Sequence, residues 1–215
     1  HRSGLLIERS DVCTFGDMSM EDSQSKRIIG RYEGTERGPL LICISGIHGN
    51  EQAGVKALTL MLKMLEVEPI TNEDFSYKGR LLALKGNLQA IEKGARFIKR
   101  DLNRTWKPKY VHDIISQDPS MLIAEDFELY HLHKIILREI AEYQPSSLVF
   151  LDLHTTTASG GIFTIPYEDE RSIATAKDLF APVILGLLEG IDGTIMHYFN
   201  QQQFPDIPTI SLCFE

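Results

Sequence analysis

The sequence predicts an α/β layered fold with a mainly parallel central sheet. Short, almost continuously apolar runs alternate with segments of helical periodicity along most of the chain, which is the pattern of strands connected by helices. The runs lack the strict alternation of a half-exposed strand, so we expect strands that are buried on both faces. The 215 residues are 43% hydrophobic and 24% charged, which suits one sizeable globular domain.

The first part of the chain supplies a lead-in, three strands and one helix. Residues 1–25 are polar and aperiodic, so we expect a poorly ordered lead-in before a single domain over 26–215. Glu51–Leu65 has apolar residues at helical spacing and predicts a helix. The expected strands are a short edge strand within Arg27–Gly34 and two buried strands over Leu40–Ser45 and Leu81–Leu84.

The second part continues the alternation. Glu125–Tyr143 is the clearest amphipathic helix, and Pro145 is expected to stop it. A second long helix is predicted over Glu168–Glu189, ended by Gly190. Further strands are expected within 147–157, 160–167, 193–199 and 208–215.

Charge and cysteine content exclude several classes of protein. A net charge of −8 would repel a phosphate backbone, which argues against a nucleic-acid partner. No apolar run approaches the roughly 20 residues that a membrane span needs. Cys13, Cys43 and Cys213 form no CxxC pair, and we expect buried thiols in a reducing compartment, which predicts a cytoplasmic protein. The composition leaves a homo-oligomer open.

The two ends of the chain carry an expectation of their own. Residue 1 is His1 rather than methionine, and Glu215 closes the strand-like stretch "PTISLCFE". Domains rarely stop on a carboxylate at the end of a buried strand. We therefore expect the natural chain to continue beyond Glu215, so that the domain over 26–215 lacks a C-terminal portion.

Polar residues follow three of the predicted strands. His48 and Glu51 follow the first buried strand, His154 follows another, and Glu215 ends the last. The carboxyl ends of parallel strands meet at one edge of a sheet, where ligands bind in α/β proteins. An HxxE pair alone is weak evidence, and its simpler interpretation is a surface histidine beside a glutamate in the first helical turn. The buried strand before it and Gly49, which permits a tight or left-handed backbone, favour two side chains turned into one crevice.

Two histidines and one glutamate form one of the ligand sets of catalytic zinc, which leaves a position open. His48 and Glu51 supply two ligands, and His154 in "DLHTT" offers the third. The alternative for His154 is a satisfied histidine at the rim of the sheet. His131 and His133 lie two apart on a helix and face different directions. The remaining histidines lack a partner motif; they are His1, His112 and His197.

Three motifs in this order, "GIHGNE", "GARFIKRDLNR" and "DLHTT", resemble those of the succinylglutamate desuccinylase/aspartoacylase family. The resemblance covers residues 27–215. It implies a three-layer α/β fold like that of zinc carboxypeptidases, with a mainly parallel or mixed sheet and helices on both faces. It also implies one zinc ion per chain, bound by His48, Glu51 and His154.

The same resemblance gives roles to the basic segment and to the last residue. It implies that Arg96 polarises the scissile carbonyl, that Asn103 and Arg104 hold a substrate carboxylate, and that Asp101 orients a liganding histidine. Guanidinium groups bind carboxylates in a planar, two-bond geometry, and carboxylates commonly fix liganding histidines, so these roles agree with the chemistry. The alternative is a solvated basic loop. Glu215 matches the general base of the family, although it can also be an arbitrary last residue.

The function that we expect is zinc-dependent hydrolysis of the amide bond of a small N-acyl amino acid. True aspartoacylases grip a second carboxylate with a further arginine shortly before the base, whereas here only Lys177 lies between Arg171 and Glu215. This difference weakens the case for N-acetylaspartate. The alternatives are a carboxypeptidase-like peptidase or amidase with the same zinc site, and a binding module without catalysis.

Overall fold

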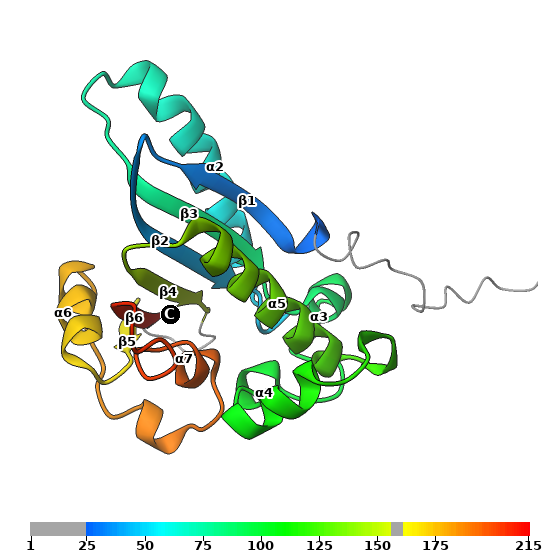
Figure 1. Cartoon of the computed structure of the whole chain (residues 1–215). Coiled ribbons are helices and arrows are strands. Elements are labelled where there is room, and N and C mark those ends of the chain that lie inside the picture. Colours follow the sequence, from blue (N-terminus) through cyan, green and yellow to red (C-terminus); the bar gives the residue numbers. More distant parts are fainter. Residues whose placement is uncertain (1–24, 156–160) are drawn as a thin grey trace, which may run out of the picture.

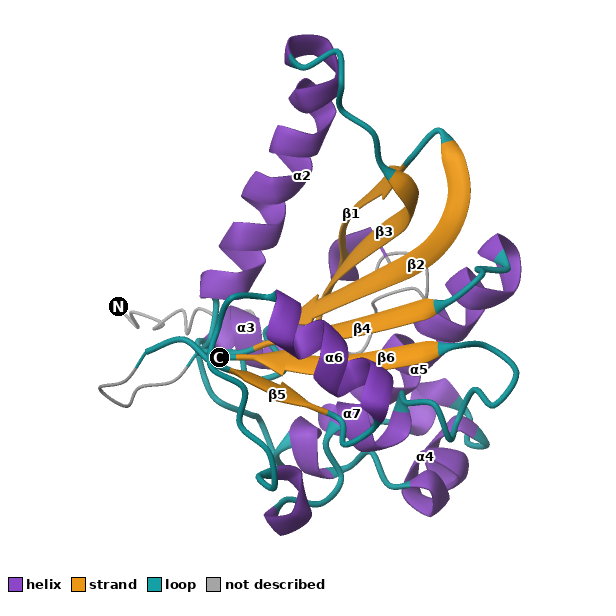
Figure 2. Cartoon of the chain, turned by 90° about the vertical axis from the view of Figure 1, so that its left-hand side faces the viewer, coloured by secondary structure: helices purple, strands orange, loops and turns teal. Residues whose placement is uncertain are grey.

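The computed structural model describes residues 25–155 and 161–215 (Figures 1 and 2). All but the last residue of the predicted lead-in over 1–25 therefore lies outside the described part. A six-stranded sheet forms the centre of the fold, in the order β1-β3-β2-β4-β6-β5. The strands are β1 (Ile28–Glu33), β2 (Glu36–Ser45), β3 (Lys78–Lys85), β4 (Leu148–Leu153), β5 (Thr164–Pro166) and β6 (Thr209–Phe214).

The sheet is mixed. The four central strands β3, β2, β4 and β6 run parallel to one another, whereas the edge strands β1 and β5 pair antiparallel with β3 and β6. The helices are α2 (Ala53–Thr71), α3 (Leu88–Lys93), α4 (Pro108–Ile115), α5 (Glu125–Tyr143), α6 (Glu170–Asp178) and α7 (Ile195–Tyr198). Three short 3₁₀ turns complete the described elements: η1 (Leu102–Arg104), η2 (Pro119–Met121) and η3 (Leu188–Gly190).

Strand alternation divides the core into two clusters on opposite faces of the sheet. Successive side chains of a strand point to opposite faces, and in β2 the side chain of Cys43 packs with Leu58 and Leu62 of α2. Its neighbours Ile42 and Ile44 belong to the larger cluster, which α5 and α7 cover. Figure 1 shows α2 and α5 on the two sides of the sheet. The predicted three-layer arrangement is thus confirmed.

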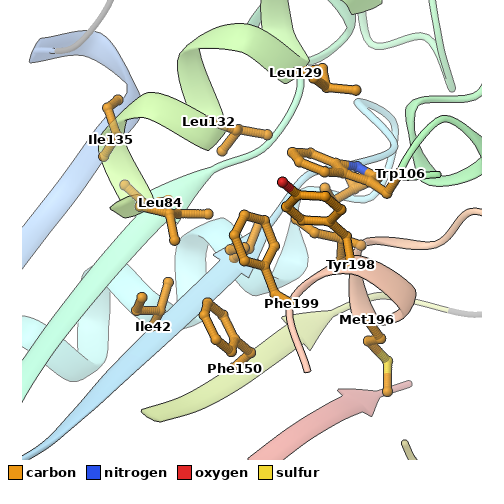
Figure 3. Packing of buried hydrophobic residues seen from close by; sticks show 14 of the residues in the cluster. Ile42, Leu84, Trp106, Leu129, Leu132, Ile135, Phe150, Met196, Tyr198 and Phe199 are labelled. Carbon is orange, nitrogen blue, oxygen red and sulfur yellow. The ribbon is translucent and has the colours of Figure 1, made fainter. Parts of the chain in front are cut away.

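Aromatic rings fill the larger cluster beside the sheet (Figure 3). The indole of Trp106 is fully buried and lies 5.9 Å from the ring of Tyr198 and 5.5 Å from that of Phe199, centroid to centroid. Phe199 also stacks on Phe150 of β4 at 5.0 Å. These contacts hold the segment around α7 against the sheet, next to the strand ends.

Two predicted elements are wrong. The expected helix over Glu168–Glu189 ends at Asp178 as α6, and an irregular segment with η3 follows. Pro182 lacks the N–H that a helix needs and disfavours a helical conformation at the residue before it. Phe180, two residues earlier, has a positive φ of 54°. The segment instead returns to the sheet, where the carbonyl of Pro182 accepts the N–H of Thr164.

The expected strand within 193–199 is the short helix α7. Short apolar runs do not distinguish a strand from a buried helical turn by periodicity. Here Met196, Tyr198 and Phe199 are all buried, so the segment has no exposed face that would have revealed a period of two. The other predicted strands and the helix over Glu125–Tyr143 are confirmed. Among the described residues, no helix is long and apolar enough to cross a membrane.

Candidate metal centre

The parallel strands β2, β4 and β6 end at the same edge of the sheet (Figure 2). After β2 the chain turns at Gly46, whose φ of 72° is the left-handed conformation that glycine adopts without strain. Gly49 serves close approach rather than a left-handed turn, because a Cβ there would lie 2.0 Å from the carbonyl carbon of Ala90. The Gly49 N–H donates to the carbonyl of Arg96 at 3.2 Å, which joins the turn to the basic segment.

The sequence predicted Glu51 in the first turn of a helix, but in the structure Glu51 precedes the helix. Helix α2 begins at Ala53 with Gln52 as its N-cap, and the Glu51 N–H closes a turn onto the carbonyl of His48 at 3.0 Å. The tight turn keeps the two side chains on the same side of the backbone. Glu51 is therefore directed by the turn and not by the helix.

Three potential ligands converge at this edge. His48 Nδ1 lies 2.9 Å from Glu51 Oε1, and His154 Nδ1 lies 2.9 Å from Glu51 Oε2. One ligand atom from each of the three residues falls within 4.8 Å of the others. The carboxylate of Glu51 is also held by the N–H of Thr155 at 3.1 Å. The structure thus brings together the three residues that the sequence proposed, as a group that could bind a metal ion.

Each imidazole is backed by a second carboxylate. His48 Nε2 lies 3.0 Å from Asp101 Oδ1, and His154 Nε2 lies 2.7 Å from Asp152 Oδ2. An Nε2–H that donates to a carboxylate leaves Nδ1 as the electron-pair donor for a metal, which is the usual arrangement around liganding histidines. The donor set therefore fits a divalent cation. Sequence reasoning found Asp101 but missed Asp152, although residues two apart on a strand share a face and "DLH" carries that spacing.

The charges of the centre are strongly coupled. Burial acts to raise the pKa of Glu51, but hydrogen bonds from His154 and His48 outweigh it and hold the pKa well below its usual value. Burial lowers the pKa of His48, while Asp101 and Glu51 raise it by more. Burial likewise opposes ionisation of Asp101, yet its bond to His48 brings its pKa down to about 2. The carboxylates are thus ionised around the histidines, an environment that attracts a cation.

The basic segment lies against this centre. Arg96 donates to Glu51 Oε1 and to Asp101 Oδ2, both at 3.3 Å, and its side chain is about half exposed. Asn103 is buried; its Oδ1 accepts the N–H of Ile195 at 2.8 Å, and its Nδ2 lies 3.2 Å from His154 Nε2. The side-chain oxygen of Asn103 thus binds the backbone at the start of α7, while its side-chain nitrogen lies next to the histidine of the centre.

Arg104 differs from Arg96 because it lacks an acidic partner. Its Nη1 donates a hydrogen bond to the backbone carbonyl of Asn103 at 2.6 Å. No carboxylate of the described chain forms an ion pair with it. The nearest described negative charge that it influences is that of Asp101, whose pKa it helps to lower. An exposed guanidinium that forms no ion pair is available to bind an anion from solution.

A buried carboxylate that the sequence did not single out holds the basic segment in place. Glu125, the first residue of α5, is 1% exposed and accepts the N–H groups of Ile98, Lys99 and Arg100 at 2.7, 3.0 and 3.1 Å. It also accepts Asn87 Nδ2 at 3.0 Å. Burial acts against its charge, but these bonds keep its pKa below the usual value. The sequence signal that could have identified Glu125 is its position as an acidic residue at the start of the clearest amphipathic helix.

Glu215 directly follows β6. Its backbone N–H donates to the carbonyl of Phe163 and its carbonyl accepts the N–H of Phe163, so the pairing of β6 with β5 extends to Glu215. Burial raises the pKa of Glu215, and the neighbouring charge of Glu51 raises it further against the opposite effect of His154. Glu215 lines a cavity of about 330 Å³. Six further predicted residues line the same cavity: His48, Glu51, Arg96, Asn103, Arg104 and His154.

The other histidines lie elsewhere. His131 and His133 are buried on α5 within the core, where His133 Nε2 lies 3.0 Å from the Tyr198 hydroxyl. His197 Nδ1 lies 2.7 Å from Thr194 Oγ1, and His112 is exposed on α4. Cys43 and Cys213 are buried free thiols as predicted, and burial raises the pKa of Cys43 to about 12. Cys13 and His1 lie outside the described residues.

Known structures share this fold. Succinylglutamate desuccinylase from Chromobacterium violaceum superposes with a TM-score of 0.58 at 16% identity, over 90% of this chain and 64% of that one. A protein described as a "putative metallopeptidase" from Shewanella amazonensis SB2B gives 0.53 at 15% identity, over 91% of this chain and 81% of that one. At these identities the similarity establishes the fold alone.

Sequence comparison is more specific. Succinylglutamate desuccinylase from Pseudomonas putida (strain GB-1) is 36% identical over 142 residues, which are 65% of this chain and 38% of that protein. The "probable aspartoacylase" of Nostoc sp. (strain PCC 7120) is 30% identical over 122 residues, 57% of this chain and 37% of that protein. The chain thus spans less than two fifths of these two relatives. A protein-family model described as "Succinylglutamate desuccinylase/Aspartoacylase catalytic domain" matches residues 37–210 of the sequence. The chain therefore belongs to this family.

Proposed function

We propose that this chain carries the catalytic site of a zinc-dependent hydrolase that cleaves the amide bond of a small N-acyl amino acid. One observation carries the proposal: His48 and His154 converge on Glu51, and each imidazole is bonded at its other nitrogen to a carboxylate. Two histidines and a glutamate are a ligand set of catalytic zinc that leaves a position open. Zinc held there would activate a water molecule and polarise the amide carbonyl.

Glu215 is the proposed general base. Its side chain lines the same cavity, and burial raises the pKa of its carboxyl towards the range in which it can both accept and release a proton. It takes a proton from the attacking water and passes it to the leaving amine nitrogen. The free amino acid and the carboxylic acid are the products.

Arg96 and Arg104 have different roles, each directed at a different negative charge of the substrate. Arg96 is held by Glu51 and Asp101 beside the ligand group, where its guanidinium stabilises the oxyanion that develops on the amide carbonyl. Arg104 has no acidic partner among the described residues and binds the substrate carboxylate, with Asn103 beside it. Anchoring the carboxylate holds the scissile bond at a constant distance from the base, which lowers the entropic part of the barrier.

The comparisons support this substrate class, since two of the relatives are named for enzymes that act on N-acylated amino acids. The two described free thiols support a reducing location, for which we propose the cytoplasm. A second candidate function is a peptidase or amidase on the same site, which the fold similarity to a "putative metallopeptidase" favours. Peptides with a free amino terminus distinguish the two, because only the peptidase hydrolyses them.

Metal analysis combined with an assay of N-acyl amino acids tests the proposed function. We expect one zinc per chain, and hydrolysis that falls by about 10²- to 10⁴-fold in Glu215→Gln with zinc retained. Glu189→Gln, an exposed glutamate in η3, is the matched control and keeps full activity. Near-normal activity of Glu215→Gln contradicts the role of Glu215. Zinc far below one equivalent, with no hydrolysis after zinc is added back, indicates a binding module instead.

A further inference from the structure

The residues that line the cavity are of two chemical kinds. One group comprises the histidines, the carboxylates and the two arginines. A second group of lining residues, here called the apolar wall, comes from three separate elements: Ile165 of β5, Leu188 of η3 and Met196 of α7, with Ile191 between η3 and α7. Cys213 lies instead beside the centre, because its thiol falls within 4.8 Å of ligand atoms of Asp152 and His154. The four residues of the apolar wall are buried or half-buried. In Figure 3 the Met196 side chain points away from the aromatic rings of the core.

The apolar wall is tied to the segment that carries Arg104. The Asn103 side chain accepts the Ile195 N–H at 2.8 Å, and the Trp106 N–H donates to the carbonyl of Gly193 at 3.0 Å. The backbones approach so closely that a Cβ at Gly193 would lie 2.4 Å from the carbonyl oxygen of Arg104. An anion bound by Arg104 therefore lies beside the apolar wall.

Among the described residues, the cavity lining offers one cation that is free to bind a substrate anion. Arg96 and Arg104 are the only arginines or lysines that line it within the described part of the chain. Arg96 is already paired with Glu51 and Asp101, whereas Arg104 forms no ion pair with a described carboxylate, although its charge helps to lower the pKa of Asp101. A second substrate carboxylate against the apolar wall would be buried without a partner and repelled by Glu215 and Asp152.

We propose that the site takes N-acyl amino acids with one carboxylate and an apolar side chain, of the size of leucine or methionine. This inference rests on the proposed function. The carbon that bears the α-carboxylate also bears the side chain, so a carboxylate on Arg104 directs that side chain to Met196, Leu188 and Ile191. Dicarboxylic N-acyl amino acids lose this contact and gain an unpaired charge.

Leucine and aspartate provide an isosteric test, because the branched end of leucine and the carboxylate of aspartate have similar shapes. The full chain, loaded with zinc, is assayed with the N-acetyl and N-succinyl derivatives of both amino acids, and with N-succinylglutamate. We expect kcat/KM for the leucine compounds to exceed that of the dicarboxylic compounds by about 100-fold or more. A preference for aspartate or glutamate overturns the inference and leaves the proposed function standing. Absence of hydrolysis in both series counts against the proposed function itself.

Equilibrium binding separates specificity from turnover. In Glu215→Gln loaded with zinc, calorimetry gives the affinity of each compound without hydrolysis. Ile191→Arg adds a cation to the apolar wall at a half-buried position, and we expect it to shift the aspartate-to-leucine affinity ratio towards aspartate by about 10-fold or more. Met196→Ala weakens binding of the leucine compound about 10-fold. An unchanged ratio in Ile191→Arg overturns the inference even if Met196→Ala fails to fold.

Met64→Ala is the matched control for Met196→Ala. Met64 on α2 is 60% exposed and does not line the cavity, so Met64→Ala is expected to bind both compounds within about twofold of the parent. Equal losses for the leucine and aspartate compounds in Met196→Ala would indicate a general loosening of the site. Such a result contradicts an apolar side-chain pocket.

Discussion

Two pairs of histidines in this molecule have opposite environments. His48 and His154 lie at strand ends, where carboxylates approach both nitrogens of each ring and raise the pKa of each imidazole. His131 and His133 lie two apart on α5 inside the core, and burial lowers the pKa of both to about 4. His131 Nε2 and His133 Nδ1 have no partner among the described residues. Surrounding carboxylates, and not the residue type, therefore distinguish a candidate ligand from a core histidine.

The largest expected effect comes from removing a strand-end histidine. His154→Ala eliminates one of three ligands and leaves Asp152 and Glu51 without their shared partner, so we expect zinc to be lost and hydrolysis to fall at least about 10³-fold. Metal analysis and the amide assay measure both. His112→Ala, at an exposed position, is the control and retains zinc. A variant of His154 that keeps its zinc would break the comparison.

The carboxylates behind the histidines should have a smaller effect. Asp152→Asn keeps the shape of the side chain but removes the charge that fixes His154, and we expect zinc affinity to fall about 10- to 100-fold. Competition with a chelator measures the affinity. Asp178→Asn, at an exposed position at the end of α6, provides the control. Equal zinc affinity in Asp152→Asn and the parent would show that backing carboxylates do not distinguish the two histidine pairs.

Glu125 tests whether the basic segment depends on the core helix that carries His131 and His133. Glu125→Gln weakens three bonds to backbone N–H groups, so we expect the free energy of unfolding to fall by about 2–3 kcal/mol in urea denaturation. Because the loosened segment carries Arg96 and Arg104, KM should rise while zinc content stays constant. Glu142→Gln, exposed on the same helix, should leave stability almost unchanged, because its ion pair with Arg138 lies in solvent. A stability loss with unchanged KM would mean that Glu125 serves the fold alone.

The smallest effect concerns pH. His131 packs on Phe127 and faces the charges of Arg27 and Glu128; its pKa is lowered mainly by burial. The unfolded chain therefore takes up a proton near pH 6.5, whereas the folded chain does so only near pH 4, and stability falls as the pH drops through this window. Between pH 7 and pH 5 this group removes about 2 kcal/mol.

His131→Phe isolates that contribution. Urea denaturation of the variant and the parent at pH 7 and pH 5 gives the difference between their pH dependences, in which the other titrating groups cancel. We expect the variant to lose less stability on acidification than the parent. If both lose the same amount, His131 is protonated in the folded chain and the contrast between the two histidine pairs fails.

The sequence motifs were sufficient to predict which residues meet at the strand ends. His48 and His154 could be identified because each comes soon after a buried apolar run, and Glu51 because it lies three residues after His48. Parallel strands bring such positions to one edge of the sheet. Asp152 and Glu125 were missed for a different reason. A carboxylate on a strand or at a helix start is common, and only its partners in space distinguish a positioning residue from an ordinary one. The long helix predicted over Glu168–Glu189 was wrong because Pro182 interrupts a pattern that otherwise has helical periodicity. The strand predicted within 193–199 was wrong because a short apolar run does not distinguish a strand from a helical turn.

The sequence by itself determined the α/β alternation, the buried strands and the identity of the potential ligands, because these depend on local hydrophobic period and short spacings. Only the tertiary structure decided what surrounds them: Asp152 behind His154, Glu125 beneath the basic segment, and the apolar wall built from β5, η3 and α7. These contacts join residues far apart in the chain, and their energies depend on burial and on distance. A linear pattern records neither quantity.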